Sequence, residues 1–169
     1  CAISADGQTI VSASDDKTVK LWDTQTGAEK GTLAEHTRTV SRCAISADGR
    51  TVVSASGDGT VKIWDAPTGA KRLTLRGHTA WVNSCAISAD GQTIVSASYD
   101  KTLKVWDGRS HAERLTLHGH ELTITGCSIS ADGTTIISAS RDKTVRVWDS
   151  RTGACLATLL AGIVPAGTL

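Results

Sequence analysis

Short apolar segments alternate with polar turns along the chain, and no segment has the 3.6-residue spacing of an amphipathic helix. Residues 1–4 read CAIS, residues 8–14 read QTIVSAS and residues 18–23 read TVKLWD, so β-branched residues are frequent. An Asp-Gly pair at 6–7 separates the first two segments, and Asp-Gly tolerates the positive φ of a tight hairpin turn. A fourth short segment follows before the pattern starts again. The pattern predicts four antiparallel strands joined by turns.

This pattern repeats every 42 residues without slippage. Residues 1–14 recur unchanged as residues 85–98. The positions that keep the period most clearly are Cys1, Cys43, Cys85 and Cys127, and likewise Trp22, Trp64, Trp106 and Trp148. The period divides the chain into units at about 1–36, 37–78, 79–120 and 121–162, followed by a non-repeat tail at 163–169.

The strands of one unit are apolar on both faces, so a single sheet cannot bury them. Radial stacking of twisted four-stranded sheets around a channel covers both faces of every sheet. A β-sandwich is the alternative architecture, but it does not explain a strict 42-residue identity.

Each unit resembles a WD40 repeat, on the basis of Gly-His, Asp-Gly, Ser-x-Ser-x-Asp and Trp-Asp in this order. Gly-His occurs at 77–78 and 119–120 with the variant Glu-His at 35–36, and Trp-Asp closes all four units. The resemblance covers residues 1 to about 160. It implies an all-β, WD40-type β-propeller fold with four tandem four-stranded antiparallel blades, and a non-catalytic role in binding other proteins.

The resemblance also implies a buried hydrogen-bonded tetrad of His, Ser, Asp and Trp in each blade. The matching residues are His36, Ser54, Asp58 and Trp64; His78, Ser96, Asp100 and Trp106; His120, Ser138, Asp142 and Trp148; and, without a His, Ser12, Asp16 and Trp22. Which Ser of each pair takes part, Ser12 or Ser14 for instance, rests on the resemblance alone.

A His, an Asp and a Ser together could also indicate a catalytic triad. A catalytic site occurs once, however, and this set occurs in three blades without a Gly-x-Ser-x-Gly turn. A catalytic propeller is disfavoured too, because the expected channel strand VSRCAIS carries no paired acids. We therefore expect a structural tetrad and no enzyme activity.

Charge and cysteine content narrow the partners and the compartment. The net charge of +1 favours neither nucleic acid nor an anionic membrane as a partner. Four of the five Cys occupy equivalent positions, which predicts packing in the core, and no metal-ligand spacing or cofactor motif is present. Five reduced thiols are typical of a cytoplasmic protein.

Positions that vary between otherwise matching blades are candidates for partner binding. In the family these positions lie on the top face near the channel mouth, and Trp, Tyr and Arg are enriched in interface hot spots. The candidate contact residues are Trp81, Asn83, Tyr99 and Arg141, with Asp15 and Arg38 at the rim. The alternative for Trp81 is that it packs only against its own loop.

Four blades are fewer than the six to eight with which propellers of this family usually close. Since the chain contains no Met, we expect it to be part of a longer WD-repeat protein with more blades. The alternative is a self-assembling architectural repeat, in which two chains close an eight-bladed ring as a homodimer. An open arc that aggregates is the third possibility.

Overall fold

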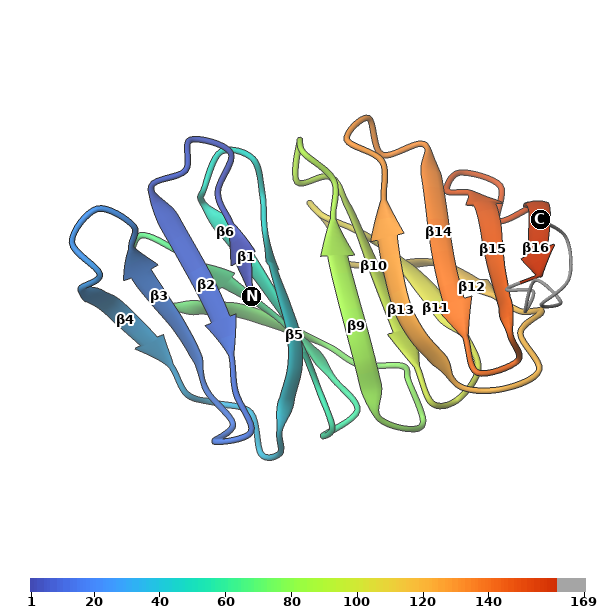
Figure 1. Cartoon of the computed structure of the whole chain (residues 1–169), viewed down its shortest axis with the longest axis horizontal. Coiled ribbons are helices and arrows are strands. Elements are labelled where there is room, and N and C mark those ends of the chain that lie inside the picture. Colours follow the sequence, from blue (N-terminus) through green and yellow to red (C-terminus); the bar gives the residue numbers. More distant parts are fainter. Residues whose placement is uncertain (161–169) are drawn as a thin grey trace, which may run out of the picture.

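The computed structural model describes residues 1–160, which form four separate four-stranded sheets (Figure 1). Each sheet is an antiparallel meander whose strands follow chain order, so the predicted fold class is confirmed. The strands are β1 (Ala2–Ile3), β2 (Thr9–Ala13), β3 (Val19–Asp23) and β4 (Glu29–Leu33) in blade 1; β5 (Val40–Ile45), β6 (Thr51–Ser56), β7 (Val61–Asp65) and β8 (Lys71–Leu75) in blade 2; β9 (Val82–Ile87), β10 (Thr93–Ser98), β11 (Leu103–Asp107) and β12 (Glu113–Leu117) in blade 3; and β13 (Ile124–Ile129), β14 (Thr135–Ser140), β15 (Thr144–Asp149) and β16 (Cys155–Leu160) in blade 4. The predicted tail at 163–169 lies outside the described residues.

The Asp-Gly hairpins form because the Asp side chain closes the turn and the Gly adopts the left-handed conformation. In the first hairpin, Asp6 accepts hydrogen bonds from the Ser4 hydroxyl (2.5 Å) and the Gln8 amide (2.9 Å). Gly7 has a φ of 70°, which costs little without a Cβ. The same bonds recur in the other three blades, so one local sequence sets the same strand register four times.

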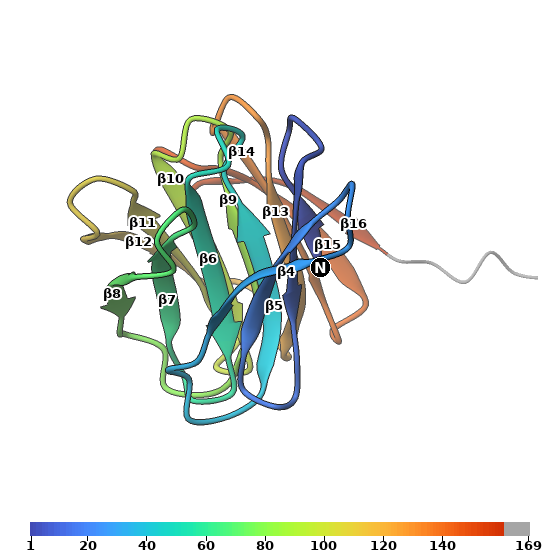
Figure 2. The ribbon, with the colours of Figure 1, turned by 90° about the vertical axis from the view of Figure 1, so that its left-hand side faces the viewer.

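The blades are arranged in an arc. Their first strands β1, β5, β9 and β13 lie side by side along the inner side, and the later strands of each blade fan outward (Figures 1 and 2). Figure 1 looks into the open side of this arc, with blade 1 on the left and blade 4 on the right. Blades 1 and 4 do not pair with one another.

The hydrophobic core lies between the sheets, as the two-sided pattern requires. Between blades 2 and 3, Val53 and Ile63 of the earlier blade pack in one buried cluster with Ile94 and Trp106 of the later blade. The residues 42 positions before and after these build the clusters between blades 1 and 2 and between blades 3 and 4. Each junction is therefore a copy of the same interface.

The repeat cysteines do not all lie in the core. Cys43 and Cys85 are buried, whereas Cys127 is half-buried and Cys1 is exposed. Cys1 has no preceding blade against which to pack, which is why the prediction is wrong for this residue. Within residues 1–160, no helix is long and apolar enough to cross a membrane.

Packing between blades predicts a large difference between two leucines of β8. Leu75 is 3% exposed inside a junction, whereas Leu73 on the same strand is 40% exposed. We expect Leu75→Ala to lower the free energy of unfolding by about 2–5 kcal/mol through lost burial and a cavity. Leu73→Ala is the matched control and should cost less than about 1 kcal/mol. Urea denaturation measures both, and equal losses would contradict the placement of the core.

Candidate functional site

The four tetrad residues of blade 2 form a continuous hydrogen-bonded chain. His36 Nδ1 lies 2.8 Å from Asp58 Oδ2, and His36 Nε2 lies 2.8 Å from Ser54 Oγ. The Trp64 indole donates to the same Ser54 oxygen at 2.9 Å. An ionised Asp58 can only accept, so Nδ1 carries the imidazole proton and Nε2 accepts from the Ser54 hydroxyl. Every polar side-chain group of this tetrad therefore has a hydrogen-bond partner.

The structure brings together the corresponding residues of blades 3 and 4 in the same way. The Nδ1–carboxylate distance is 2.7 Å for both His78–Asp100 and His120–Asp142. The Nε2–hydroxyl and indole–hydroxyl bonds are those of His78, Ser96 and Trp106 and of His120, Ser138 and Trp148, at 2.7–2.9 Å.

Blade 1 contains only part of the tetrad. Trp22 donates to Ser12 at 2.8 Å, so Ser12 rather than Ser14 takes this position. Asp16 is exposed and accepts from Thr18 instead of from a His.

Hydrogen bonding sets the ionisation state of the tetrad carboxylates. Burial of Asp58 opposes its ionisation, but bonds from Thr60 and His36 outweigh this and lower its pKa to about 2. Burial also opposes the ionisation of Asp100 and of Asp142, but hydrogen bonds outweigh it and hold the pKa of both carboxyls well below the usual range. Burial lowers the pKa of His36, although Asp58 opposes this. The tetrad of blade 2 thus pairs a carboxylate with a neutral imidazole.

The tetrads fix loops and leave no hydroxyl accessible to a substrate. Asp58 also accepts from the Thr37 amide at 3.1 Å, which ties the loop before β5 to the β6–β7 hairpin. The three tetrad serines Ser54, Ser96 and Ser138 are at most 2% exposed. Within residues 1–160, no cluster of His, Cys, Asp and Glu could hold a metal ion.

These loops lie together at one end of the blades. We call this end the top face; in Figure 1 it points downward. It carries the hairpins at 14–18, 56–60, 98–102 and 140–144 and the connections at 34–39, 76–81 and 118–123. The connections between successive blades lie along the lower edge of Figure 1.

Trp81 and Tyr99 form an aromatic pair on the top face. Their ring centroids are 5.6 Å apart in a T-shaped arrangement, and the Tyr99 amide donates to the Trp81 carbonyl. The Trp81 indole reaches over Gly57 of the preceding blade, where a Cβ would lie only 1.0 Å from Nε1. Trp81 therefore packs across a blade boundary and not only against its own loop. It is still 38% exposed, and Tyr99 is 37% exposed.

A depression of about 420 Å³ lies beside this pair. Its lining includes Arg38, Gly57, Gly59 and Trp81. Blade 2 alone has glycine on both sides of its tetrad Asp, since the other blades have Lys at the position of Gly59. The missing side chains open this depression between blades 2 and 3.

Among the predicted contact residues, Arg38 lines the depression with Trp81, whereas Asp15, Asn83 and Arg141 do not line it. Asp15 and Arg141 are exposed in the hairpins of blades 1 and 4 respectively. Asn83 is half-buried, and its side-chain Nδ2 donates a hydrogen bond to the Ile124 carbonyl at 2.9 Å. This bond ties β9 to β13 and commits one donor of Asn83 to the fold.

Two features of the top face were not predicted. One is Gly57, which leaves the space that the Trp81 indole occupies. In the sequence it could have been noticed as a glycine at a repeat position where the other blades have large or charged residues. Leu122 is 48% exposed in the connection before blade 4. Its signal was an apolar residue at a position occupied by Arg38 and Ala80 in the other connections.

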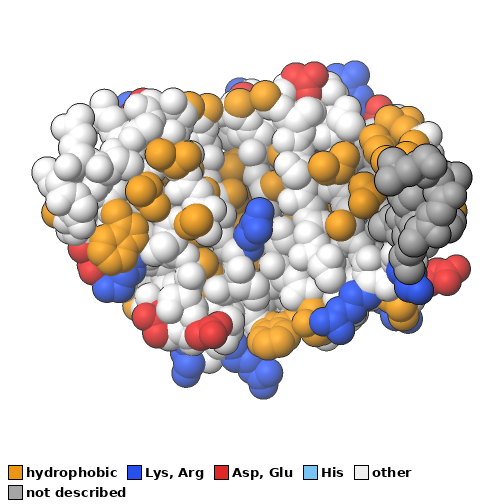
Figure 3. All heavy atoms as spheres, viewed as in Figure 1, with side chains coloured by type: hydrophobic (Ala, Val, Ile, Leu, Met, Phe, Trp, Pro, Cys, Tyr) orange, Lys and Arg blue, Asp and Glu red, His pale blue; other side chains and the backbone are white. Residues whose placement is uncertain are grey.

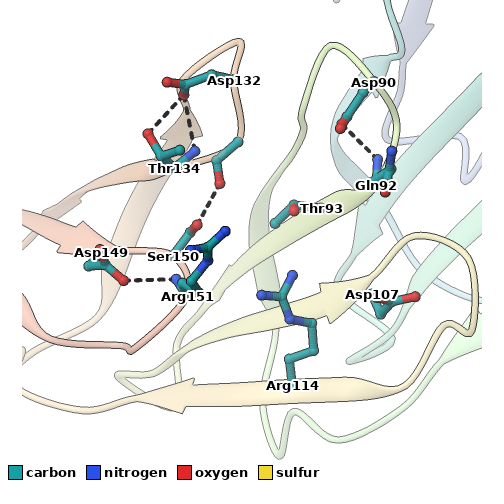
Figure 4. A pocket seen from close by; sticks show the side chains of 11 residues that line it. Asp90, Gln92, Thr93, Asp107, Arg114, Asp132, Thr134, Asp149, Ser150 and Arg151 are labelled. Atoms are coloured by element: carbon teal, nitrogen blue, oxygen red, sulfur yellow. Dashed lines mark hydrogen bonds between the residues drawn. The ribbon is translucent and has the colours of Figure 1, made fainter.

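A second depression, of about 310 Å³, lies at the opposite end between blades 3 and 4 (Figure 4). Arg114 and Arg151 point into it (Figure 4). Its other lining residues are largely turn residues of the repeat, and Asp149 accepts hydrogen bonds from its own turn. We assign the candidate site to the top face, where the blades differ.

The tetrad predicts a loss of stability in acid. The folded pKa of Asp58 lies below its ordinary value, so its contribution is present above about pH 4 and disappears as the pH falls toward 2. His36 acts in the same direction, because its folded pKa is also lowered: below about pH 6.5 the imidazole is protonated in the unfolded chain while the buried ring stays neutral, which favours unfolding. Asp58→Asn should cost about 1–3 kcal/mol at pH 7 and flatten the decline below pH 4. Asp16→Asn, at the same repeat position without a His, is the control and should change the pH profile less. Urea denaturation across this pH range tests this, and an unchanged slope for Asp58→Asn would contradict it.

The overlap at Gly57 predicts that a single methyl group displaces Trp81. Gly57 does not have a positive φ, so Gly57→Ala is free of backbone strain and acts by steric conflict alone. We expect the accessibility of Trp81 to an aqueous fluorescence quencher to rise, with Trp81→Ala identifying its signal. Gly31→Ala, where a Cβ meets no atom within 4 Å, is the matched control. Unchanged quenching in Gly57→Ala would show that Trp81 does not lie over Gly57.

Comparisons with known proteins agree with this geometry. The pattern of the family described as WD domain, G-beta repeat matches residues 1–23, 27–65, 69–107 and 112–149. No curated protein matches the chain. Among solved structures, the one titled "Structure of U3-55K" superposes with a TM-score of 0.88 at 25% identity, over 94% of this chain. The chain spans about half of that protein (50%). The first match covers β1–β3, and each later match covers the last strand of one blade and the first three strands of the next. Because the four matches cover well over half of the sequence, this chain belongs to the WD-repeat family.

Proposed function

We propose that this chain is a non-catalytic scaffold or recognition module that binds other proteins through its top face, as a portion of a larger WD-repeat protein. The observation that carries the proposal is the half-exposed pair of Trp81 and Tyr99, placed where the otherwise repetitive blades differ. Aromatic side chains of this kind supply a large share of binding energy at protein interfaces.

Pre-organisation supports a binding role for this pair. Trp81 lies over Gly57 and beside Tyr99. The connection at 76–81 that carries Trp81 is also fixed by the hydrogen bond between His78 and Asp100. Little conformational entropy is then lost when a partner covers the rings. The alternative in which Trp81 serves packing alone leaves its exposed surface unexplained.

The charges on the top face indicate the chemistry of the partner segment that would fit it. Exposed cations surround the top face of blades 2–4, namely Arg38, Arg76, Lys101, Arg141 and Lys143. The exposed acids Glu35 and Glu121 lie in the connections before blades 2 and 4. We expect the partner segment to place an apolar or aromatic side chain against Trp81 and acidic groups near these cations. Asp15 would favour a basic group at the blade 1 end.

A second candidate function is architectural. It is favoured by large apolar side chains exposed on the outer faces of blades 1 and 4, such as Ile3 and Ile137. In this function the chain closes an eight-bladed ring as a homodimer and needs no other ligand. The two functions use different surfaces and can be tested separately.

The proposal places the protein in the cytoplasm and assigns it no enzyme activity. Five unpaired thiols support a reducing compartment. The burial of every tetrad serine in blades 2–4 supports a structural role for the only His-Asp-Ser sets in the described residues.

Selection from a displayed peptide library tests the binding role. Peptides enriched on the wild-type chain should share an apolar or aromatic residue next to Asp or Glu. Trp81→Ala combined with Tyr99→Ala should weaken their binding at least about tenfold, equivalent to about 1.4 kcal/mol. Leu73→Ala removes an exposed apolar side chain away from the top face and is the control. Full binding by the double variant would refute the proposed site.

A further inference from the structure

The outer faces of blades 1 and 4 expose side chains that are buried at every internal junction. Ile137 of blade 4 is 46% exposed, whereas Val95 at the same repeat position is 0% exposed. Leu159 is 54% exposed, whereas Leu117 is 3% exposed. Figure 3, drawn into the open side of the arc, shows apolar side chains over blade 1 on the left and over blade 4 on the right.

These two faces are the opposite halves of one interface. Blade 4 presents Ile137, Val147 and Leu159, which occupy the positions of Val53, Ile63 and Leu75 on blade 2. In blade 2 those residues are covered by the facing side of blade 3.

Blade 1 presents the other half. Residues 1–14 are identical to residues 85–98 of blade 3, so Cys1, Ile3 and Ile10 repeat Cys85, Ile87 and Ile94. At the internal junction these three residues pack on the outer face of blade 2, together with Trp106. Trp22, the counterpart of Trp106, is only half-buried because nothing covers it.

We propose that the open faces are an interaction surface for a second copy of this chain, which docks head to tail with its blade 1 on blade 4. The contact would repeat most side chains of the junction between blades 2 and 3, with the exception of Val82, which has no counterpart in the sequence. Formed twice, it closes a ring of eight blades, each turned by about 45° from the next, within the range of known propellers. The proposal carries the architectural candidate further, as the alternative to additional blades in the same polypeptide, and it is independent of partner binding at the top face.

The intermolecular junction is weaker than the internal ones. In blades 2–4 a His from the preceding connection bonds the tetrad Asp, whereas Asp16 accepts from Thr18 and from no His among the described residues. The new junction therefore has the apolar contact without the bonds that tie the connection to the hairpin. We expect the dimer to dissociate on dilution.

Light scattering coupled to size exclusion tests the contact through two charge variants. Ile3→Lys and Ile137→Asp change side chains that are 58% and 46% exposed in the single chain, so both variants should fold. Their counterparts Val53 and Ile87 belong to the same apolar cluster and come from its two sides, so both positions lie within the proposed contact. The wild type should have a mass of about 35 kDa, twice the 17.6 kDa of one chain.

Each variant alone should run as a monomer, because it places an unpaired charge in both junctions of the ring. An equimolar mixture should again form a dimer, since one junction pairs the new ammonium with the new carboxylate and the other is wild type. Leu122→Asp, which alters an exposed leucine of the top face, is the matched control and should stay dimeric. Circular dichroism of each variant confirms that the sheets are intact.

Three results would overturn the proposal. A wild type that is monomeric at all concentrations would show that a second copy does not dock on these faces. A dimer that survives Ile3→Lys but not Ile137→Asp would indicate contact between two copies of blade 4. Assemblies larger than a dimer would show that the head-to-tail contact does not close. The peptide selection on monomeric Ile137→Asp reports on the top face separately, so either proposal can fail without the other.

Discussion

Burial of both faces of every sheet between its neighbours is the constraint on which the structure depends. A sheet that carries Val52 on one side and Val53 on the other has no solvent-compatible face. The hydrophobic effect, at about 25 cal/mol per Å² of apolar surface, therefore favours stacking over any isolated blade. The same constraint accounts for the curvature of the arc, the burial in blades 2 and 3, and the exposed apolar surface at both ends.

The tetrads convert this stacking into a defined top face. Apolar contact between sheets is not directional, and it would tolerate small shifts of one blade on the next. The hydrogen bonds from His36 and its counterparts join each connection to a hairpin at fixed distances, with all buried partners satisfied. Variable residues carried by these connections, Trp81 among them, are thereby held in place without altering the framework. Surface residues can therefore differ from blade to blade without any change in the framework that positions them.

The fold could be predicted from positions that recur every 42 residues, because the period locates the strands and the two-sided apolar pattern requires stacking. The tetrad partners could be predicted only from the resemblance to WD40 repeats, and the structure brings the same residues together in blades 2–4. Contacts across a blade boundary between non-repeated residues could not be predicted in this way. The packing of Trp81 on Gly57 depends on which connection overlies which hairpin, and the bond from Asn83 to Ile124 depends on the spacing of the inner strands. The exposure of Cys1 depends on the absence of a neighbour, which a repeat pattern does not encode.

Amide hydrogen exchange of the chain, at a dilution where it is monomeric, tests the central claim most directly. If stacking between neighbours stabilises each sheet, amides of β6 and β10, in the blades covered on both sides, should exchange most slowly. Amides of β14, at the same repeat position in a blade covered on one side, should exchange faster, although β14 pairs with its two neighbouring strands over as many residues as β6 does. Equal protection of β6, β10 and β14 would contradict the account, because it would mean that each blade is stable without its neighbours.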